Sequence, residues 1–398
     1  MKKTRNLFIC VVIACFTALL FQASIYAANG KSFAIGNKKY DSLQDAFNNV
    51  KSGQTIKVLN NYELMGPTMN RKVNFTLDLN GKTLTLFRFG TIQVAGNCNM
   101  TIKGKGAIKK ENPSGRIIVV ENGASLTINS PATFVGSIFN RGKLTIKKGT
   151  FKNIKTNRVG LLSNRDNGQL IISGGSFTNA SVYAGENGGV IENRDQGKVK
   201  ITGGTFRHTG ALDSHASDVY DPHKEGGCII GSDTSSKGSI TISGGTFQST
   251  CNILRCNNST LTISNGKFSV DGAGVLWLDG NAKATLTGGT YSAKKSNELC
   301  TIVAKSKLTV KGGTFNSEWS VFENWSRDAV LTISGGSFIT TMNEKNAMVR
   351  NADGKTYITG GSFTGKNCYG YFTEEGGTVK VGKNVKWDVK EVELKQID

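Results

Sequence analysis

The chain has 398 residues, of which 49 are lysine or arginine and 29 are aspartate or glutamate, so its formal net charge is +20. Hydrophobic residues make up 38% of the sequence, which suffices for a packed core and excludes an intrinsically disordered protein. The 49 glycines follow no three-residue period and only one long apolar run is present, which excludes collagen and polytopic membrane proteins.

The first 28 residues have the pattern of a secretory signal peptide. Basic residues stand among the first five positions, an apolar run extends from Leu7 to Phe21, and small residues follow at Ala27 and Ala28. The run is short for a membrane span; an uncleaved anchor and a lipoprotein modified at Cys15 are the alternatives. We therefore expect a secreted or cell-surface protein with no membrane span in the mature chain.

Residues 29–70 are expected to form an N-terminal cap that contains one short helix. Between residues 42 and 50, apolar side chains recur at the spacing of a single helical face, and Ser42 with Asp45 offers an N-terminal capping box. The apolar positions are Leu43, Ala46, Phe47 and Val50. Such a helix would cover the open end of the repeats that follow; a flexible terminus is the alternative.

The main feature of the sequence is an internal repeat, apolar-x-Gly-Gly-Ser/Thr-aromatic, as in Ile242-Ser243-Gly244-Gly245-Thr246-Phe247. The aromatic positions are Phe151, Phe177, Phe206, Phe247, Phe268, Tyr291, Phe315, Phe338 and Phe363. A second motif, apolar-apolar-x-Asn, precedes the aromatic residue in several units. Its copies end at Asn122, Asn164, Asn193, Asn324 and Asn351.

Short strands separated by Gly and Asn corners predict the coils of a β-solenoid, in which stacking buries the apolar side of every coil. We expect about a dozen coils over residues 71–385, followed by a C-terminal cap or tail over 386–398. The aromatic residues should stack as an internal ladder, and the Gly-Gly pairs should supply corners with positive φ. The recurrent Asn should adopt a left-handed corner and hydrogen-bond the Asn of the next coil.

These repeats resemble those of the pectate-lyase-like superfamily, particularly secreted bacterial proteins with Gly-Gly-Thr-Phe repeats. The resemblance covers about residues 75–385 and implies an all-β, single-stranded, right-handed parallel β-helix. It is specific for the fold and weak for activity. Lyases of this kind bind calcium through stacked carboxylates and use an Arg or Lys base, whereas the hydrolases use paired Asp on neighbouring coils.

The outward position before each Asn corner was aligned to look for such carboxylates. The aligned residues are Glu121, Phe139, Ser163, Glu192, Ile230, Arg255, Trp277, Glu323 and Arg350. One coil, between Trp277 and Glu323, is left unaligned. No two carboxylates fall on adjacent coils in this row, so neither calcium binding nor a carboxylate pair is evident there. Glu323 and Arg350 are expected to form a surface ion pair.

Six cysteines remain after the leader, and in an exported protein they permit fifteen disulfide pairings. We favour their interpretation as small buried hydrophobic residues. They are Cys98, Cys228, Cys251, Cys256, Cys300 and Cys368.

One coil carries a long loop, because the spacing between Phe206 and Phe247 is much longer than elsewhere. All three histidines lie in this region together with several carboxylates: His208, His215, His223, Asp213, Asp218, Asp221 and Glu225. They are candidates for a metal site or a general base. The histidine spacing matches no short metal motif, so a solvated loop is the favoured interpretation and no metal site is predicted.

Basic residues concentrate in the first coils, where acids are rare. We expect them to form one patch that binds anionic glycans, although general solubility is the alternative explanation. The candidates are Lys103, Lys105, Lys109, Lys110, Arg116, Lys143, Lys147, Lys148, Lys152 and Lys155.

The sequence therefore favours a secreted or cell-surface β-helix protein that is adhesin-like and non-catalytic. Its expected partner is an anionic polysaccharide or surface polymer and not nucleic acid, and we expect a monomer without a cofactor. One alternative is a polysaccharide lyase or glycoside hydrolase on an acidic glycan, with calcium in the lyase case and with the His208–Glu225 loop beside the cleft. The other alternative is a structural envelope component.

Overall fold

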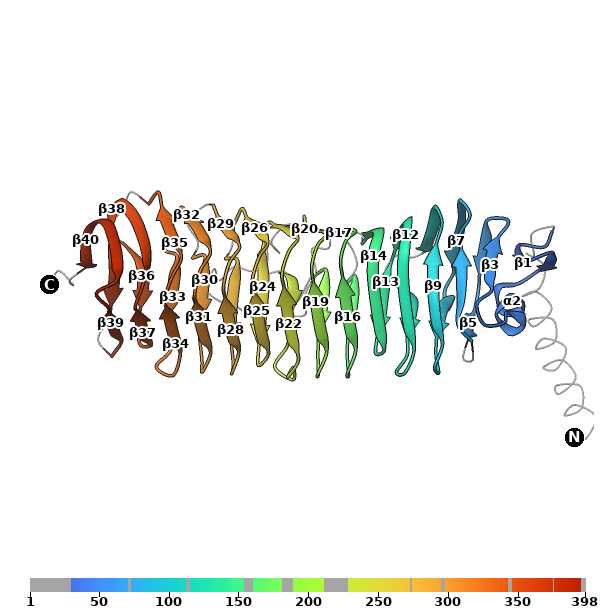
Figure 1. Cartoon of the computed structure of the whole chain (residues 1–398), viewed down its shortest axis with the longest axis horizontal. Helices are drawn as coiled ribbons and strands as arrows, with labels where there is room; N and C mark the ends of the chain where they lie inside the picture. Colours follow the sequence, from blue (N-terminus) through green and yellow to red (C-terminus); the bar gives the residue numbers. More distant parts are fainter. Residues whose placement is uncertain are drawn as a thin grey trace, which may run out of the picture.

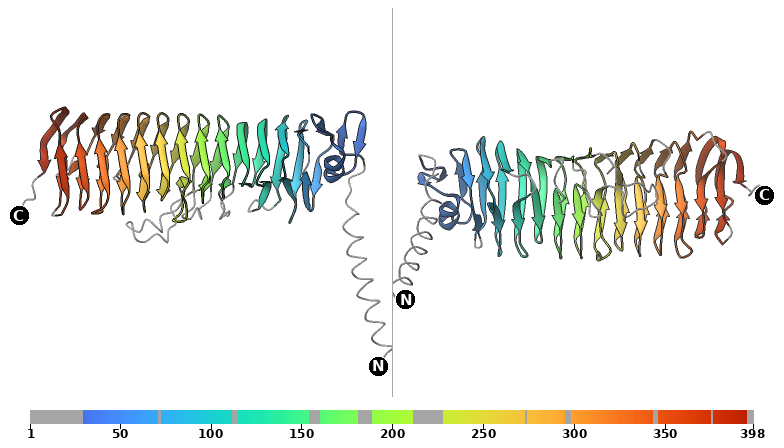
Figure 2. Two further views of the ribbon diagram at one scale, coloured as in Figure 1. Left: turned by 60° about the horizontal axis from the view of Figure 1, so that its bottom comes forward. Right: turned by 180° about the vertical axis from the view of Figure 1, so that it is seen from behind.

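The computed structural model describes residues 30–70, 73–111, 115–153, 160–180, 189–210, 228–272, 274–294, 298–342, 346–374 and 376–394. The expected signal peptide and most of the long loop lie outside these residues. The described chain forms a parallel β-solenoid of about 12 turns, confirming the predicted all-β fold. Figures 1 and 2 show a long rod with the strands stacked along its axis and the two termini at opposite ends.

Each turn contributes up to three short strands, which stack on those of the next turn as three parallel sheets. We name them A, B and C in the order in which one turn passes through them. Sheet A consists of β5 (Pro67–Asn70), β8 (Thr91–Val94), β11 (Arg116–Val120), β13 (Ser137–Asn140), β15 (Leu162–Asn164), β18 (Ile191–Asn193), β21 (Cys228–Gly231), β24 (Asn252–Asn257), β27 (Leu276–Asp279), β30 (Cys300–Ile302), β33 (Phe322–Asn324), β36 (Ala347–Asn351) and the end of β38 (Gly361–Thr373).

Sheet B begins nearest the N-terminus. It consists of β3 (Thr55–Val58), β6 (Phe75–Asp78), β9 (Asn99–Lys103), the first parts of β12 (Ser125–Val135) and β14 (Lys143–Lys152), β16 (Gln169–Ile172), β19 (Lys198–Ile201), β22 (Ser239–Ile242), β25 (Thr260–Ile263), β28 (Lys283–Leu286), β31 (Lys307–Val310), β34 (Val330–Ile333), β37 (Lys355–Ile358) and β39 (Thr378–Val381).

Sheet C completes each turn. It consists of β4 (Tyr62–Leu64), β7 (Lys82–Leu86), β10 (Gly106–Lys110), the last parts of β12 and β14, β17 (Ser176–Asn179), β20 (Thr205–His208), β23 (Thr246–Ser249), β26 (Lys267–Val270), β29 (Thr290–Ala293), β32 (Thr314–Ser317), β35 (Ser337–Thr340), the start of β38 and β40 (Val385–Leu394).

The predicted aromatic ladder is present inside sheet C. Consecutive rings stack with centroids 4.4–5.0 Å apart, close to the spacing of neighbouring strands. The ladder begins one coil earlier than the sequence motif, at Phe134, and ends at Trp387, which stacks on Phe363. A regular column of large buried rings thus fixes the register of successive coils.

The two glycines of each Gly-Gly pair serve different physical needs. The second glycine has positive φ, for example 109° at Gly245, as expected. The first glycine makes room for the coil below, because a Cβ at Gly244 would lie 2.5 Å from the carbonyl oxygen of Thr202. Gly245 is therefore required by its dihedral angle and Gly244 by packing, whereas Lys148 and Asn265 occupy the first position in two other coils.

The recurrent asparagines form a ladder but not the expected corners. The Asn140 amide donates to Asn164, and Asn164 donates to Asn193, at 2.7 and 2.8 Å. None of these residues has positive φ; the left-handed positions are Asp166 and Asp195, two residues further along. The prediction of left-handed Asn was wrong because the Asn belongs to the end of the sheet A strand and the turn follows it.

The N-terminal end is closed by a helix and a hairpin. Helix α2 (Leu43–Asn49) has Ser42 as its N-cap, with the Ser42 hydroxyl accepting from the Asp45 amide, and it buries Leu43, Ala46 and Phe47, as predicted. The antiparallel strands β1 (Phe33–Ile35) and β2 (Lys38–Tyr40) complete this end, and β1 also pairs with β3. Parallel stacking starts at β3 and continues through β40, so it extends into both terminal segments.

Replacing one ring of the aromatic ladder should destabilise the solenoid. We expect Phe247→Ala to lower the free energy of unfolding by about 3–5 kcal/mol, because Phe247 is fully buried between two rings. Phe89→Ala is the matched control, since Phe89 is 80% exposed and its loss should change stability by less than about 0.5 kcal/mol. Chemical denaturation followed by circular dichroism measures both; equal effects would contradict a structural role for the ladder.

Candidate functional site

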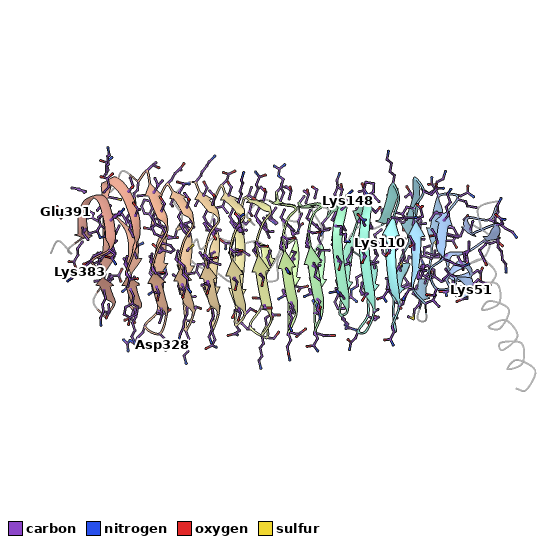
Figure 3. All side chains as sticks on the ribbon, viewed as in Figure 1. Lys51, Lys110, Lys148, Asp328, Lys383 and Glu391 are labelled. Carbon is purple, nitrogen blue, oxygen red and sulfur yellow. The ribbon has the colours of Figure 1, made fainter. Side chains whose placement is uncertain are left out.

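The outward face of sheet B is strongly basic. Its strands carry ten lysines, all exposed, and Asp78 is the one acidic residue among the described strands of this sheet. The lysines are Lys57, Lys103, Lys143, Lys147, Lys198, Lys200, Lys283, Lys307, Lys355 and Lys380. Figure 3 shows side chains pointing outward along the whole rod.

Half of these lysines share one line along the rod, which we name the lysine lane. It is the first strand position of sheet B from β14 to β37, and strand register places these residues directly on one another. In order, the lane contains Lys143, Gln169, Lys198, Ser239, Thr260, Lys283, Lys307, Val330 and Lys355. Eight steps of roughly 4.8 Å give it a length of roughly 38 Å.

The basic residues predicted in the N-terminal coils do not share one face. Lys103, Lys143 and Lys147 lie on sheet B, whereas Lys109, Lys110 and Lys152 belong to sheet C. Lys105 and Lys148 lie at the corner between these sheets, Arg116 begins β11 in sheet A, and Lys155 lies outside the described residues.

Lys110 does not present its charge to solvent. It is 8% exposed, and its ammonium donates to the carbonyl oxygen of Gly90 at 2.6 Å. Burial lowers the pKa of Lys110, because the charged form loses hydration. This residue therefore has a structural role and does not contribute to a ligand surface.

Sequence reasoning missed the lysines beyond residue 160, because it ranked segments by their charge density along the chain. A usable signal was present in the repeat itself. Several repeats have a lysine at the same number of residues before the glycine of the next corner. They are Lys143-Leu144-Thr145-Ile146, Lys283-Ala284-Thr285-Leu286 and Lys307-Leu308-Thr309-Val310. Equivalent positions in a solenoid stack in space, whatever their distance in sequence.

The histidine cluster finds no support as a site. His208 ends β20 and is 2% exposed, in register with Asn179 and Ser249 of the neighbouring coils. The other candidates, His215, His223, Asp213, Asp218, Asp221 and Glu225, lie outside the described residues. In the part of the chain that the structure describes, no group of three or more His, Cys, Asp or Glu is arranged to hold a metal ion.

The outward row of sheet A has a different register from the one predicted. Phe139 pairs with Val119 and not with Glu121, and Glu192 pairs with Gly231 and not with Ile230. The unaligned coil contributes Thr301, which lies between Trp277 and Glu323. The first error arises because Val120, and not Asn122, pairs with Asn140, so the Asn motif of that coil lies two residues beyond the expected register.

Two buried carboxylates on sheet A are neutralised by neighbouring arginines. Glu192 is 3% exposed; its oxygens lie 2.6 Å from Arg194 Nε and 3.2 Å from Arg165 Nη2, and the Ser163 hydroxyl donates to it at 2.7 Å. Side chains of the protein itself thus occupy the hydrogen-bonding positions around the Glu192 carboxylate. The cluster links adjacent coils and has no free position for a ligand.

Glu323 is also bonded by neighbouring side chains, but its pKa is higher than the ordinary value of a glutamate. Trp325 Nε1 and Arg350 Nη1 each donate to this carboxylate at 2.7 Å, and Glu323 is 2% exposed, so the predicted ion pair with Arg350 is buried and not superficial. Burial and the hydrogen-bonded carboxyl of Glu298 raise the pKa of Glu323 to about 7, against the opposing effect of Arg350. A narrow pocket that includes Glu374 borders this group.

The cysteines behave as buried hydrophobic residues. All six are buried, and the structure contains no disulfide among the residues that it describes, as the sequence interpretation expected. Burial raises the pKa of Cys228 and of Cys256 to about 12, which disfavours a thiolate nucleophile. None of the helices in the described ranges has the length and apolar character needed to cross a membrane.

No protein family, no curated protein and no solved structure matches the chain. The functional argument therefore rests on the chain's own residues.

The proton on Glu323 should make stability depend on pH. Its pKa is raised in the folded protein above the ordinary value of 4.5, so the folded state holds a proton that the unfolded chain releases between about pH 4.5 and 7. The free energy of unfolding should therefore fall as pH rises through this window, and it should fall less in Glu323→Gln. Thermal unfolding at several pH values measures the difference between the two proteins. Identical pH profiles would contradict the assignment.

Proposed function

We propose that the protein is exported to the cell surface or the medium and there binds anionic polysaccharide through sheet B, without catalysing a reaction. The observation that carries this proposal is the lysine lane on a sheet with almost no acid. The leader over residues 1–28 and the resemblance of the repeats to secreted pectate-lyase-like proteins with Gly-Gly-Thr-Phe repeats both support export. A single exposed lysine contributes little, but lysines repeated along one face can hold a polymer by avidity.

The distribution of charge argues against general solubility as the reason for these lysines. Solubility requires only a net charge, with both signs mixed over the surface. Here the acidic side chains Glu192 and Glu323 lie on sheet A, where arginines pair with them, and the described strands of sheet B offer their lysines one possible partner, Asp78. A face that carries many lysines and almost no acid attracts a polyanion.

The second candidate is a hydrolase acting on an acidic glycan. Glu298 and Glu323 form a hydrogen-bonded carboxyl pair on neighbouring coils, and the exposed Trp325 beside them offers a surface for a sugar ring. Such pairs serve glycoside hydrolysis, with the protonated carboxyl as general acid. The burial of Glu323 and its bonds to Trp325 and Arg350 favour a structural role, which ranks this candidate second. A purely structural envelope component would neither bind nor cleave glycans.

Reversing two charges in the lysine lane should weaken binding to a uronate polymer. We expect Lys283→Glu with Lys307→Glu to lower the affinity for polygalacturonate at least tenfold at low salt, and wild-type binding to fall steeply with ionic strength. The control is Lys267→Glu with Lys294→Glu, which makes the same charge change at two exposed lysines beside sheet C. Surface plasmon resonance compares the three proteins; equal losses in both variants would show a nonspecific charge effect.

Catalysis at the carboxyl pair predicts a different outcome. If the protein cleaves uronate polymers, reducing ends should appear with time, and Glu323→Gln should abolish their release while binding persists. Assays of reducing ends and of unsaturated products, with and without calcium, test for both hydrolase and lyase. We expect no product from the wild-type protein; product formation would replace the binding proposal with an enzymatic one.

A further inference from the structure

A line of threonines runs beside the lysine lane on sheet B. Strand register stacks five of them on consecutive coils, and we name them the threonine lane. They are Thr241, Thr262, Thr285, Thr309 and Thr332. All five are partly or fully exposed, and within the described chain none of their hydroxyls takes part in a side-chain hydrogen bond.

Lysines flank this lane on both sides. Lys283 and Lys307 stand two residues before Thr285 and Thr309 on the same strands, and Lys311 stands two residues after Thr309. Two residues along a strand correspond to roughly 6.6 Å, and one coil to roughly 4.8 Å. The face is therefore a strip of neutral hydroxyls, roughly 19 Å long, with a lysine at three of its neighbouring positions, Lys283, Lys307 and Lys311.

We infer that sheet B binds a linear acidic polysaccharide lying along the solenoid axis, with its sugar hydroxyls on the threonine lane and its acidic groups on the flanking lysines. This inference rests on the proposed function and adds the class and the orientation of the ligand. Threonine hydroxyls both donate and accept hydrogen bonds, which suits the hydroxyls of a sugar. Polyphosphate offers only acceptors and charge, so it can use the lysines but gains less from the threonine lane.

The direction of the lanes also determines how affinity depends on ligand length. A chain that lies across the rod would meet one or two coils, and longer chains would add nothing. A chain that lies along the axis meets a further set of groups with every step, so its affinity should rise with length until the lysine lane, roughly 38 Å long, is filled.

The test compares two probes of similar charge, a galacturonate oligomer of about ten units and polyphosphate, by isothermal titration calorimetry. In the triple variant Thr262→Val, Thr285→Val and Thr309→Val, each hydroxyl is replaced by a methyl group of similar shape, and β-branching is kept. We expect affinity for the oligomer to fall at least tenfold and affinity for polyphosphate to change less than twofold.

The matched control makes the same change on sheet C, at Thr246→Val, Thr290→Val and Thr314→Val. These threonines share one strand position of that sheet, with Lys267 between the first two, and have no role in the proposal. It should leave both affinities unchanged. Circular dichroism and thermal unfolding verify the fold of each variant. If the triple variant does not fold, the single variants Thr285→Val and Thr285→Ser are compared instead. Serine keeps the hydroxyl and should keep the affinity for the oligomer, whereas valine should lower it.

The outcomes separate this inference from the function on which it rests. If the wild-type protein binds both probes and the sheet B variant binds both as well as before, the polysaccharide inference is wrong and polyanion binding stands. An equal loss of both probes, or affinity for galacturonate oligomers that does not rise with length, also overturns it. If the wild-type protein binds neither probe, both the inference and the proposed function fail.

Discussion

The stacking of equivalent residues at the spacing of adjacent β-strands is the constraint on which the rest of the structure depends. Inside, it turns one aromatic residue per coil into a continuous column from Phe134 to Trp387, and it turns one Asn per coil into amide ladders. It favours glycine where the corner of one coil approaches the backbone of the next, as at Gly244. A coil on its own would bury little, and only the stack makes a core.

The same constraint acts on the outer surface, where it makes repeated charge costly. Like charges in directly opposed strand positions are destabilising by a few tenths of a kcal/mol to about 1 kcal/mol. On sheet A, Glu192 pairs with Arg165 and Arg194, and Glu323 pairs with Arg350, so the carboxylates there have cationic partners. Lys283 and Lys307 stack directly on sheet B with no acid between them, so their placement opposes stability. This placement is expected of a surface that binds an anionic ligand, as the proposed function requires.

The sequence was sufficient for the interior and insufficient for the surface. The aromatic ladder, the Gly-Gly corners and the helix capped by Ser42 were predicted, because each depends on local chemistry repeated at a fixed motif position. The outward row of sheet A was misaligned at Glu121, because Val120 and not Asn122 pairs with Asn140, although Asn122 belongs to the same sequence motif. The Asn corner was misplaced because Asn suits both a left-handed turn and a side-chain ladder.

The basic surface shows why a linear count of charges is a poor guide to a solenoid. Lys109 and Lys110 are adjacent in sequence, yet one is exposed and the other is buried against Gly90. Lys143 and Lys355 are 212 positions apart, yet they lie on one straight line. Recognition by such a surface depends on how many coils a ligand reaches, because each coil offers nearly the same few groups. Under the proposed function, the ligand that fits such a surface would itself be a repeating chain, and its affinity would depend on its charge, its hydroxyls and its length.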